Sequence, residues 1–147
     1  MTAERARTLL RLEEEFGVLI RRIRRVIAER AEAVHPELPS ASYLLLAYIA
    51  EHGPVRASLI AEKFQIDKGA VSRQLQHLTD LGLVDKVVDP ADGRAHLISA
   101  SEEARRRLDE VVTQRRRWLD ERLKYWSADE LDAFAAELAR YNATLES

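Results

Sequence analysis

Two short amphipathic segments follow one another in the middle of the chain, between residues 54 and 82. In the first segment three apolar residues share one face of a helix: Leu59, Ile60 and Phe64. In the second segment three apolar residues recur at positions i, i+4 and i+7: Val71, Leu75 and Leu78. These spacings predict two helices, each with one buried side. Asp67 stands where its carboxylate can cap the second helix, and Gly82 stands where that helix is expected to end.

A β-hairpin is predicted directly after the second helix. The segments LVDKVV and AHLIS read as strands, and they flank the sequence DPADGR. Because Asp-Gly favours a tight hairpin turn, we expect the turn at Asp92-Gly93, with Arg94 at its tip. Two helices followed by such a hairpin form a winged helix-turn-helix.

The rest of the chain has the pattern of helices. Apolar residues at spacings of three and four predict a long helix over residues 4–34 and further helices within residues 101–147. The winged helix-turn-helix is expected within residues 41–100. The predicted fold class is therefore mostly α with a small β wing.

Residues 4–34 and 101–147 carry more apolar side chains than a small winged domain can cover, and Trp118 and Trp126 add to this excess. Contiguous exposed apolar surface usually marks an interface, and a two-fold homodimer is the simplest way to cover it. We therefore expect these two regions to be N- and C-terminal dimerisation helices. The alternative is that they pack only within one subunit.

Composition narrows the classes of function. The 147 residues include no cysteine, which excludes disulfides and thiolate metal sites. No apolar run reaches the roughly 20 residues of a membrane span, and the charged N-terminus does not resemble a signal peptide. We expect a cytoplasmic protein without a membrane partner. Glycine-rich phosphate loops, nucleophile elbows and HExxH are absent, so we expect no enzyme activity, no cofactor and no metal site.

The polar side of the second helix has the residue types that contact DNA. Hydroxyl, amide and cationic side chains bind base edges and phosphates in a major groove. Five outward-facing residues are expected to make these contacts: Lys68, Ser72, Arg73, Gln74 and Gln76. The net charge of −2 neither supports nor excludes DNA binding, because the local electric field at the contact surface determines the attraction for phosphates. The alternative is a winged helix that binds another protein, and such a module would show apolar anchors here.

Over nearly its whole length the chain resembles the MarR family of winged helix regulators. The resemblance is sharpest in LTDLGLVDKVVDPADGRAHLIS, at seven positions: Leu78, Gly82, Leu83, Val84, Lys86, Asp92 and Arg94. Two positions depart from the family pattern. Arg56 stands where the family often has a serine or threonine cap, and Gln65 stands where it commonly has glycine. The resemblance implies one MarR-type domain over residues 1–147.

The resemblance also implies a mechanism. Arg94 is expected to enter a minor groove of double-stranded DNA, while Asp92 aims Arg94 or pairs with a base. A homodimer is expected to bind a near-palindromic operator and act as a repressor. Many relatives respond to small aromatic anions, and the residues placed for such an effector are Arg21, Arg24, Tyr43, Tyr48 and His52. Alternatively, these arginines are solvated or paired with glutamates, and the tyrosines belong to the core.

Overall fold

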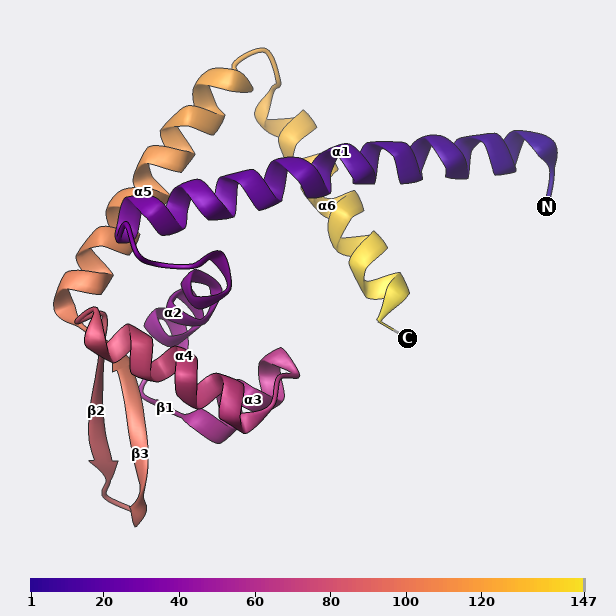
Figure 1. Ribbon diagram of the computed structural model, residues 1–147. Coiled ribbons are helices and arrows are strands. Elements are labelled where there is room, and N and C mark those ends of the chain that lie inside the picture. Colours follow the sequence, from indigo (N-terminus) through magenta and orange to yellow (C-terminus); the bar gives the residue numbers. More distant parts are fainter. Residues whose placement is uncertain (147) are drawn as a thin grey trace. The chain divides into compact units, whose positions relative to one another are not determined.

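The computed structural model describes residues 1–146, which form two compact units. The first unit, Met1–Val111, contains most of the secondary structure. Its elements are α1 (Ala3–Val34), α2 (Ser40–His52), β1 (Val55–Arg56), α3 (Ala57–Phe64), α4 (Lys68–Asp80), β2 (Val84–Asp89), β3 (Asp92–Ala100) and the start of α5 (Glu102–Arg122) (Figure 1). The second unit begins at Val112 and holds the rest of α5 and α6 (Ala128–Leu145). The expected mostly α fold class with a small β wing is confirmed.

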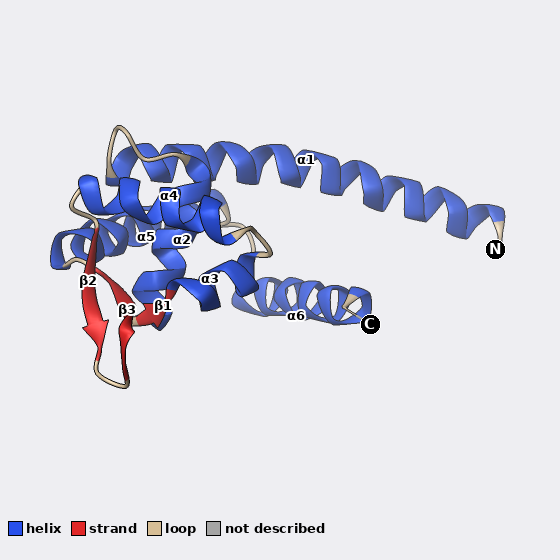
Figure 2. Ribbon diagram, turned by 60° about the horizontal axis from the view of Figure 1, so that its bottom comes forward, coloured by secondary structure: helices blue, strands red, loops and turns tan. Residues whose placement is uncertain are grey.

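The sheet has three antiparallel strands in the order β1-β3-β2, one more than the sequence predicts. β1 has only two residues, and it pairs Val55 with Ile98 of β3. A strand this short shows no alternation along the sequence, so only its pairing partner reveals it. β2 and β3 extend past the helices as a hairpin, which is the wing (Figure 2).

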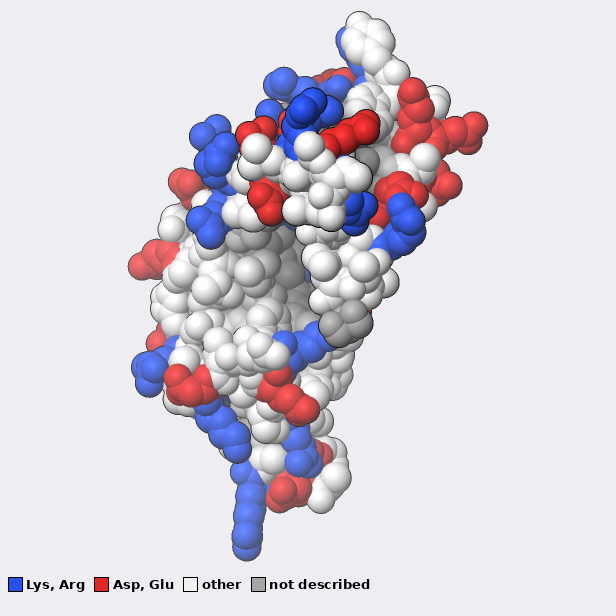
Figure 3. Space-filling view, turned by 90° about the vertical axis from the view of Figure 1, so that its right-hand side faces the viewer, with Lys and Arg blue, Asp and Glu red and all other residues white. Residues whose placement is uncertain are grey.

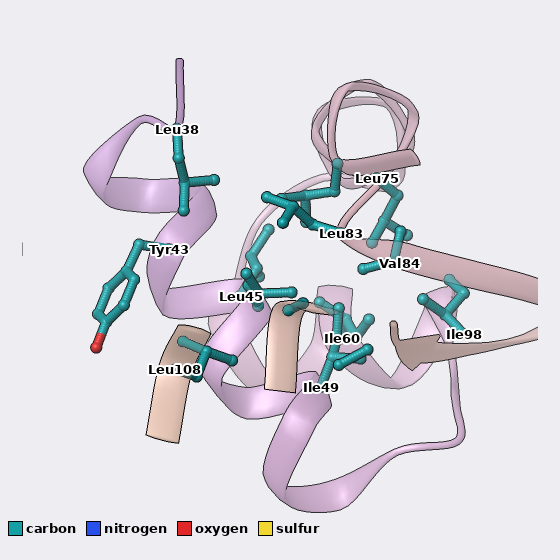
Figure 4. Close-up of a cluster of buried hydrophobic side chains, with 14 of the residues drawn as sticks. Leu38, Tyr43, Leu45, Ile49, Ile60, Leu75, Leu83, Val84, Ile98 and Leu108 are labelled. Atoms are coloured by element: carbon teal, nitrogen blue, oxygen red, sulfur yellow. The ribbon is translucent and has the colours of Figure 1, made fainter. Parts of the chain in front are cut away.

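The hydrophobic core of the first unit gathers around α2. Leu45, Leu46 and Ile49 of this helix are at most 1% exposed, and they pack with residues of α3, α4 and the sheet (Figure 4). α4 turns its predicted stripe of Val71, Leu75 and Leu78 into the same core. The apolar helix α2 therefore packs against the buried sides of α3 and α4.

The prediction for the buried face of α3 is wrong at one residue, Leu59. Ile60 is fully buried, but Leu59 is 45% exposed, and Ala61 occupies the buried position instead. Residues 59 and 61 lie on either side of Ile60, so the two readings differ only by a rotation of the helix about its axis. The packing of α3 against α4 and the sheet selects the rotation that buries the smaller residue.

Local capping follows the sequence closely. The Asp67 carboxylate accepts the Ala70 N–H at 2.9 Å, which caps α4. Gly82 has φ 72°, the left-handed conformation that glycine adopts without strain. Gln65 ends α3 with φ 52°, which is the left-handed conformation. Glycine adopts this conformation most easily, and glycine is the residue expected here from the resemblance described above.

In the second unit, Ser127 and Glu130 form a capping box at the start of α6. The Ser127 hydroxyl accepts the Glu130 N–H at 3.1 Å, and the Glu130 carboxylate accepts the Ser127 N–H at 2.7 Å. No residue of α6 is buried. Large exposed apolar side chains of this unit include Trp118, Leu119, Trp126, Leu131 and Phe134.

α1 has a similar excess of apolar surface. Only Ala31 and Val34, in its last turn, are buried. Its exposed apolar residues include Leu9, Leu12, Leu19, Ile20 and Ile23. No helix among the described residues combines the length and apolar character required to cross a membrane.

Candidate nucleic-acid interface

The outward side of α4 is polar, as the sequence predicts. Lys68, Ser72, Arg73 and Gln76 are exposed on this helix. Gln74 differs, because it is half-buried and its amide oxygen is enclosed without a hydrogen-bond partner among the described residues. It lies three residues after Val71 and one before Leu75, at the edge of the buried stripe. Four of the five candidates are therefore open to solvent.

Two of the exposed side chains of α4 have neighbours on the same helix. The Gln76 amide nitrogen donates to the Asp80 carboxylate at 2.9 Å, one helical turn away. Arg73 reaches back along the helix, because a Cβ added at Gly69 would stand 3.3 Å from its Nη1 atom. Gly69 therefore leaves room for the Arg73 guanidinium, which the sequence alone did not indicate.

The turn of the wing lies two residues before its expected position. Asp89 of β2 pairs with Asp92 of β3, so Pro90 and Ala91 form the tip and the Asp92-Gly93 turn is wrong. Proline pre-sets the φ angle of a turn, and the Asp89 carboxylate accepts the Ala91 N–H at 2.9 Å. Gly93 does not adopt the positive φ that a type I′ turn requires.

Arg94 is exposed on the first residues of β3, close to the end of the wing. The Asp92 carboxylate accepts the backbone N–H of Arg94 at 3.1 Å, which holds the backbone from which this arginine projects. Figure 3 shows basic side chains reaching the end of the wing, at the bottom of the view, with acidic ones beside them. The roles of Asp92 and Arg94 in DNA binding stay predictions.

An ion pair joins the start of α3 to the wing. The Arg56 guanidinium donates to the Asp89 carboxylate, with its Nε at 2.8 Å. The Ala91 N–H and, next, the Arg56 guanidinium hold the pKa of Asp89 below its ordinary value of 3.8. Asp89 is only 7% exposed, and these hydrogen bonds favour its ionised form although burial opposes it. Sequence reasoning missed the pair, because its members are 33 residues apart and belong to no motif.

The residues expected to bind an effector occupy different environments. Tyr43 is 4% exposed and part of the core, and its hydroxyl points away from the other labelled side chains in Figure 4. Tyr48 stacks on His52 with ring centroids 4.3 Å apart and meets Phe64 edge-on at 5.4 Å. Two arginines complete the set, Arg21 and Arg24. Both are exposed on α1, and neither forms an ion pair with a described carboxylate.

Sequence relatives and solved structures with a similar fold are both helix-turn-helix regulators. A family model described as the MarR family matches residues 37–95. The HTH-type transcriptional regulator YxaD of Bacillus subtilis (strain 168) is 33% identical over 131 residues, 89% of this chain and 90% of that protein. YdgJ of the same organism, also an HTH-type transcriptional regulator, is 30% identical over 129 residues, 87% of this chain and 77% of that protein.

Solved structures agree on the fold. The YusO protein of Bacillus subtilis has a TM-score of 0.70 and 22% identity, covering 97% of this chain and 99% of its own. A structure of MarR has a TM-score of 0.70 and 20% identity, covering 91% of this chain and 90% of its own. The sequence relatives are transcriptional regulators and not enzymes.

Proposed function

The chain belongs to the MarR family of transcriptional regulators, which have a DNA-binding helix-turn-helix fold, and on that premise we propose a homodimeric repressor of a near-palindromic operator. α4 lies in a major groove, and the end of the wing reaches the adjacent minor groove. Two copies related by a two-fold axis present two such helices about one turn of DNA apart. When the dimer occupies an operator within a promoter, it blocks access of RNA polymerase to that promoter. We place this activity in the cytoplasm.

The observation that carries this proposal is the exposed polar side of α4. Lys68, Ser72, Arg73 and Gln76 offer a cation, a hydroxyl, a guanidinium and an amide oxygen on one surface. These groups match the donors and acceptors of base edges and phosphates. A winged helix that binds protein would present large apolar anchors at the same positions, so the exposed polar face favours DNA.

An electrophoretic mobility shift with the intergenic DNA upstream of the protein's own gene tests the proposal. We expect retardation by the wild type that excess unrelated duplex does not abolish. Arg73→Ala is expected to cost about 1–3 kcal/mol of binding free energy, if Arg73 contacts a guanine, and to relax preference at that base. Lys63→Ala is the matched control, since Lys63 is an exposed cation of α3 outside the expected DNA contacts. Absence of any retardation at low salt contradicts the proposal.

The homodimer is supported by the exposed apolar side chains at both ends of the chain. α6 buries no residue within the subunit, and its Phe134 is 53% exposed. A partner subunit that covers these side chains removes apolar area from water at about 25 cal/mol per Å². We expect Phe134→Glu to shift the protein towards monomer in sedimentation equilibrium, while Glu137→Gln, on the same helix, leaves the mass unchanged. A monomeric wild type contradicts this assembly.

An aromatic or anionic effector is proposed for the side of the first unit that carries Tyr48 and His52. Their stacked rings offer an aromatic surface, and the exposed Arg21 and Arg24 offer guanidinium groups for a carboxylate. Thermal shift against a panel of phenolic acids tests this. A rise in melting temperature that Arg24→Ala removes supports the site, and a panel without any shift contradicts it.

A further inference from the structure

The start of α5 is bonded to the end of α4. The Ser101 hydroxyl donates to the Gly82 carbonyl at 2.8 Å, and the Ser101 N–H donates to the Leu83 carbonyl at 2.9 Å. Gly82 lies two residues beyond the end of α4. Ala104 and Leu108, on the first turns of α5, are buried in the core. The start of α5 therefore has a fixed position relative to α4.

The same part of α5 reaches the end of α1. The Arg107 guanidinium donates from its Nη1 to the backbone carbonyl of Val34 at 2.8 Å. Val34 is the last residue of α1, and the final carbonyls of a helix have no partner within that helix. Residues 31–34 contain no basic side chain. Arg107 therefore supplies, from another helix, the cation that suits the negative end of the α1 dipole.

Glu103 orients Arg107 for this contact. Its Oε1 accepts from the Arg107 Nε at 2.7 Å, one turn earlier on α5. Arg107 thus uses two donors of its rigid guanidinium at once, one towards the carboxylate and one towards α1. Arg106 also donates to Glu103, at 2.7 Å, but its other printed partner is Glu110 of the same helix. Within the described chain, Arg107 is therefore the arginine of this cluster that joins α5 to α1.

α1 joins the core of the first unit near this end. Among the described residues, those of α1 that belong to the core or pack against it are Ile27, Ala31 and Val34. The remaining length of the helix extends well beyond α2, α3 and α4 (Figure 1). That length carries the exposed apolar side chains proposed for dimerisation, among them Leu12 and Leu19. The dimer surface of α1 is thus held by its last turns.

The length of α1 amplifies any tilt at that end. Leu12 lies about 33 Å along the helix from Val34, at about 1.5 Å per residue. A tilt of about 10° at Val34 would move Leu12 sideways by about 6 Å over this length. Successive base pairs of DNA are about 3.4 Å apart. A small tilt of α1 therefore shifts its dimer surface, relative to α4, by more than one base pair.

We propose that Arg107 is a positioning residue, whose hydrogen bond to the Val34 carbonyl fixes the angle between α1 and α4 and thereby the half-site spacing that the dimer selects. The inference rests on the proposed function. In a dimer joined through α1, this angle determines how far apart the two α4 helices lie, and their separation must match that of the two half-sites. Arg107 is not among the expected DNA contacts, so the contacts of each subunit stay the same.

The test uses duplexes whose half-sites are moved closer together or farther apart by one or two base pairs. The parent duplex is the segment of the upstream intergenic DNA that the wild type protects from nuclease. We expect the wild type to bind the parent spacing several-fold more tightly than the altered spacings. Arg107→Met keeps the long side-chain stem without the guanidinium, and it should lose most of this preference. Arg107→Lys should restore part of it, because an ammonium can reach the carbonyl but lacks the second, fixed donor for Glu103.

Arg106→Met is the matched control. It removes a guanidinium from the same helix and the same carboxylate, but not one that contacts α1, so it should keep the wild-type preference. A duplex with a single half-site should bind Arg107→Met as tightly as the wild type, because α4 and the wing are unchanged. Circular dichroism and sedimentation equilibrium check that each variant is folded and has the wild-type mass.

A second measurement needs no DNA. The sequence has no cysteine, so Lys63→Cys introduces one site for a spin label on each subunit, at an exposed position of α3. Electron spin resonance of the labelled dimer then measures the distance between the two helix-turn-helix regions. We expect a narrow distribution of distances when Arg107 is present and a broader one in Arg107→Met. Equal widths contradict the positioning role.

The outcomes separate this inference from the proposed function. Loss of the spacing preference in Arg107→Met, with single half-site binding and Arg106→Met unchanged, supports the inference. An equal loss of affinity at every spacing overturns it, because Arg107 then only stabilises the fold. A preference retained by Arg107→Met overturns it too and leaves the proposed function standing. A wild type that binds no DNA overturns the proposed function and the spacing role with it.

Discussion

Replacement of Ile60 by alanine is expected to lower the free energy of unfolding by about 2–5 kcal/mol. Ile60 is fully buried in the core cluster. The change removes three carbon atoms, which at about 0.8 kcal/mol for each buried methylene is about 2.4 kcal/mol of lost transfer free energy. The enclosed void that remains adds to this loss, because the helices around it relax only in part.

The neighbouring residue provides the contrast. Leu59 is 45% exposed, so about half of its surface is already in water, and its truncation leaves no enclosed void. We expect Leu59→Ala to cost about 1 kcal/mol at most. Urea denaturation followed by circular dichroism measures both variants, at one protein concentration because subunit association contributes to stability. Equal losses for the two variants, or a larger loss for Leu59→Ala, would refute this packing of α3.

Three further predictions concern local structure. Asp67→Ala should cost about 0.5–2 kcal/mol of unfolding free energy in urea, since α4 loses its side-chain cap, whereas Asp67→Ser should restore most of it. Glu103 has its pKa lowered from 4.5 to about 2 by hydrogen bonds from two arginines, so its contribution to stability is complete above pH 4.5 and lost as the pH falls towards 2. The stability gap between wild type and Glu103→Gln should therefore narrow over that interval in acid titrations, and a constant gap would contradict the assignment. Gly53→Ala should lower the melting temperature, because its Cβ would stand 2.5 Å from the Ile49 carbonyl oxygen, and a neutral result would contradict that close approach.

Much of the interface could be predicted from neighbouring residues. The stripe of Val71, Leu75 and Leu78 fixes which side of α4 is buried, and hence which side is left for Lys68 and Arg73. The caps at Asp67 and Gly82 depend on backbone groups within a few residues. Such features follow from helical periodicity and short-range hydrogen bonding, and both can be predicted from residues that are close in the sequence.

Other parts of the interface depend on residues that are distant along the chain. The Arg56–Asp89 ion pair and the Ala91 N–H hold the end of β2 beside the turn, which lies at Pro90 and Ala91. The Asp-Gly preference that predicted a later turn is a weak local tendency, and an enclosed ionised carboxylate with three hydrogen bonds outweighs it.

The linear order of residues was enough to specify the helices of the winged region, the polar side of α4 and the family, because periodicity and capping act over one or two turns. It did not specify whether Leu59 or Ala61 is buried, nor that Arg56 and Asp89 form an ion pair across 33 residues. Those features appear only when α3, α4 and the sheet pack together. Packing chooses among local arrangements of similar energy, and strand pairing brings together side chains that the chain keeps apart.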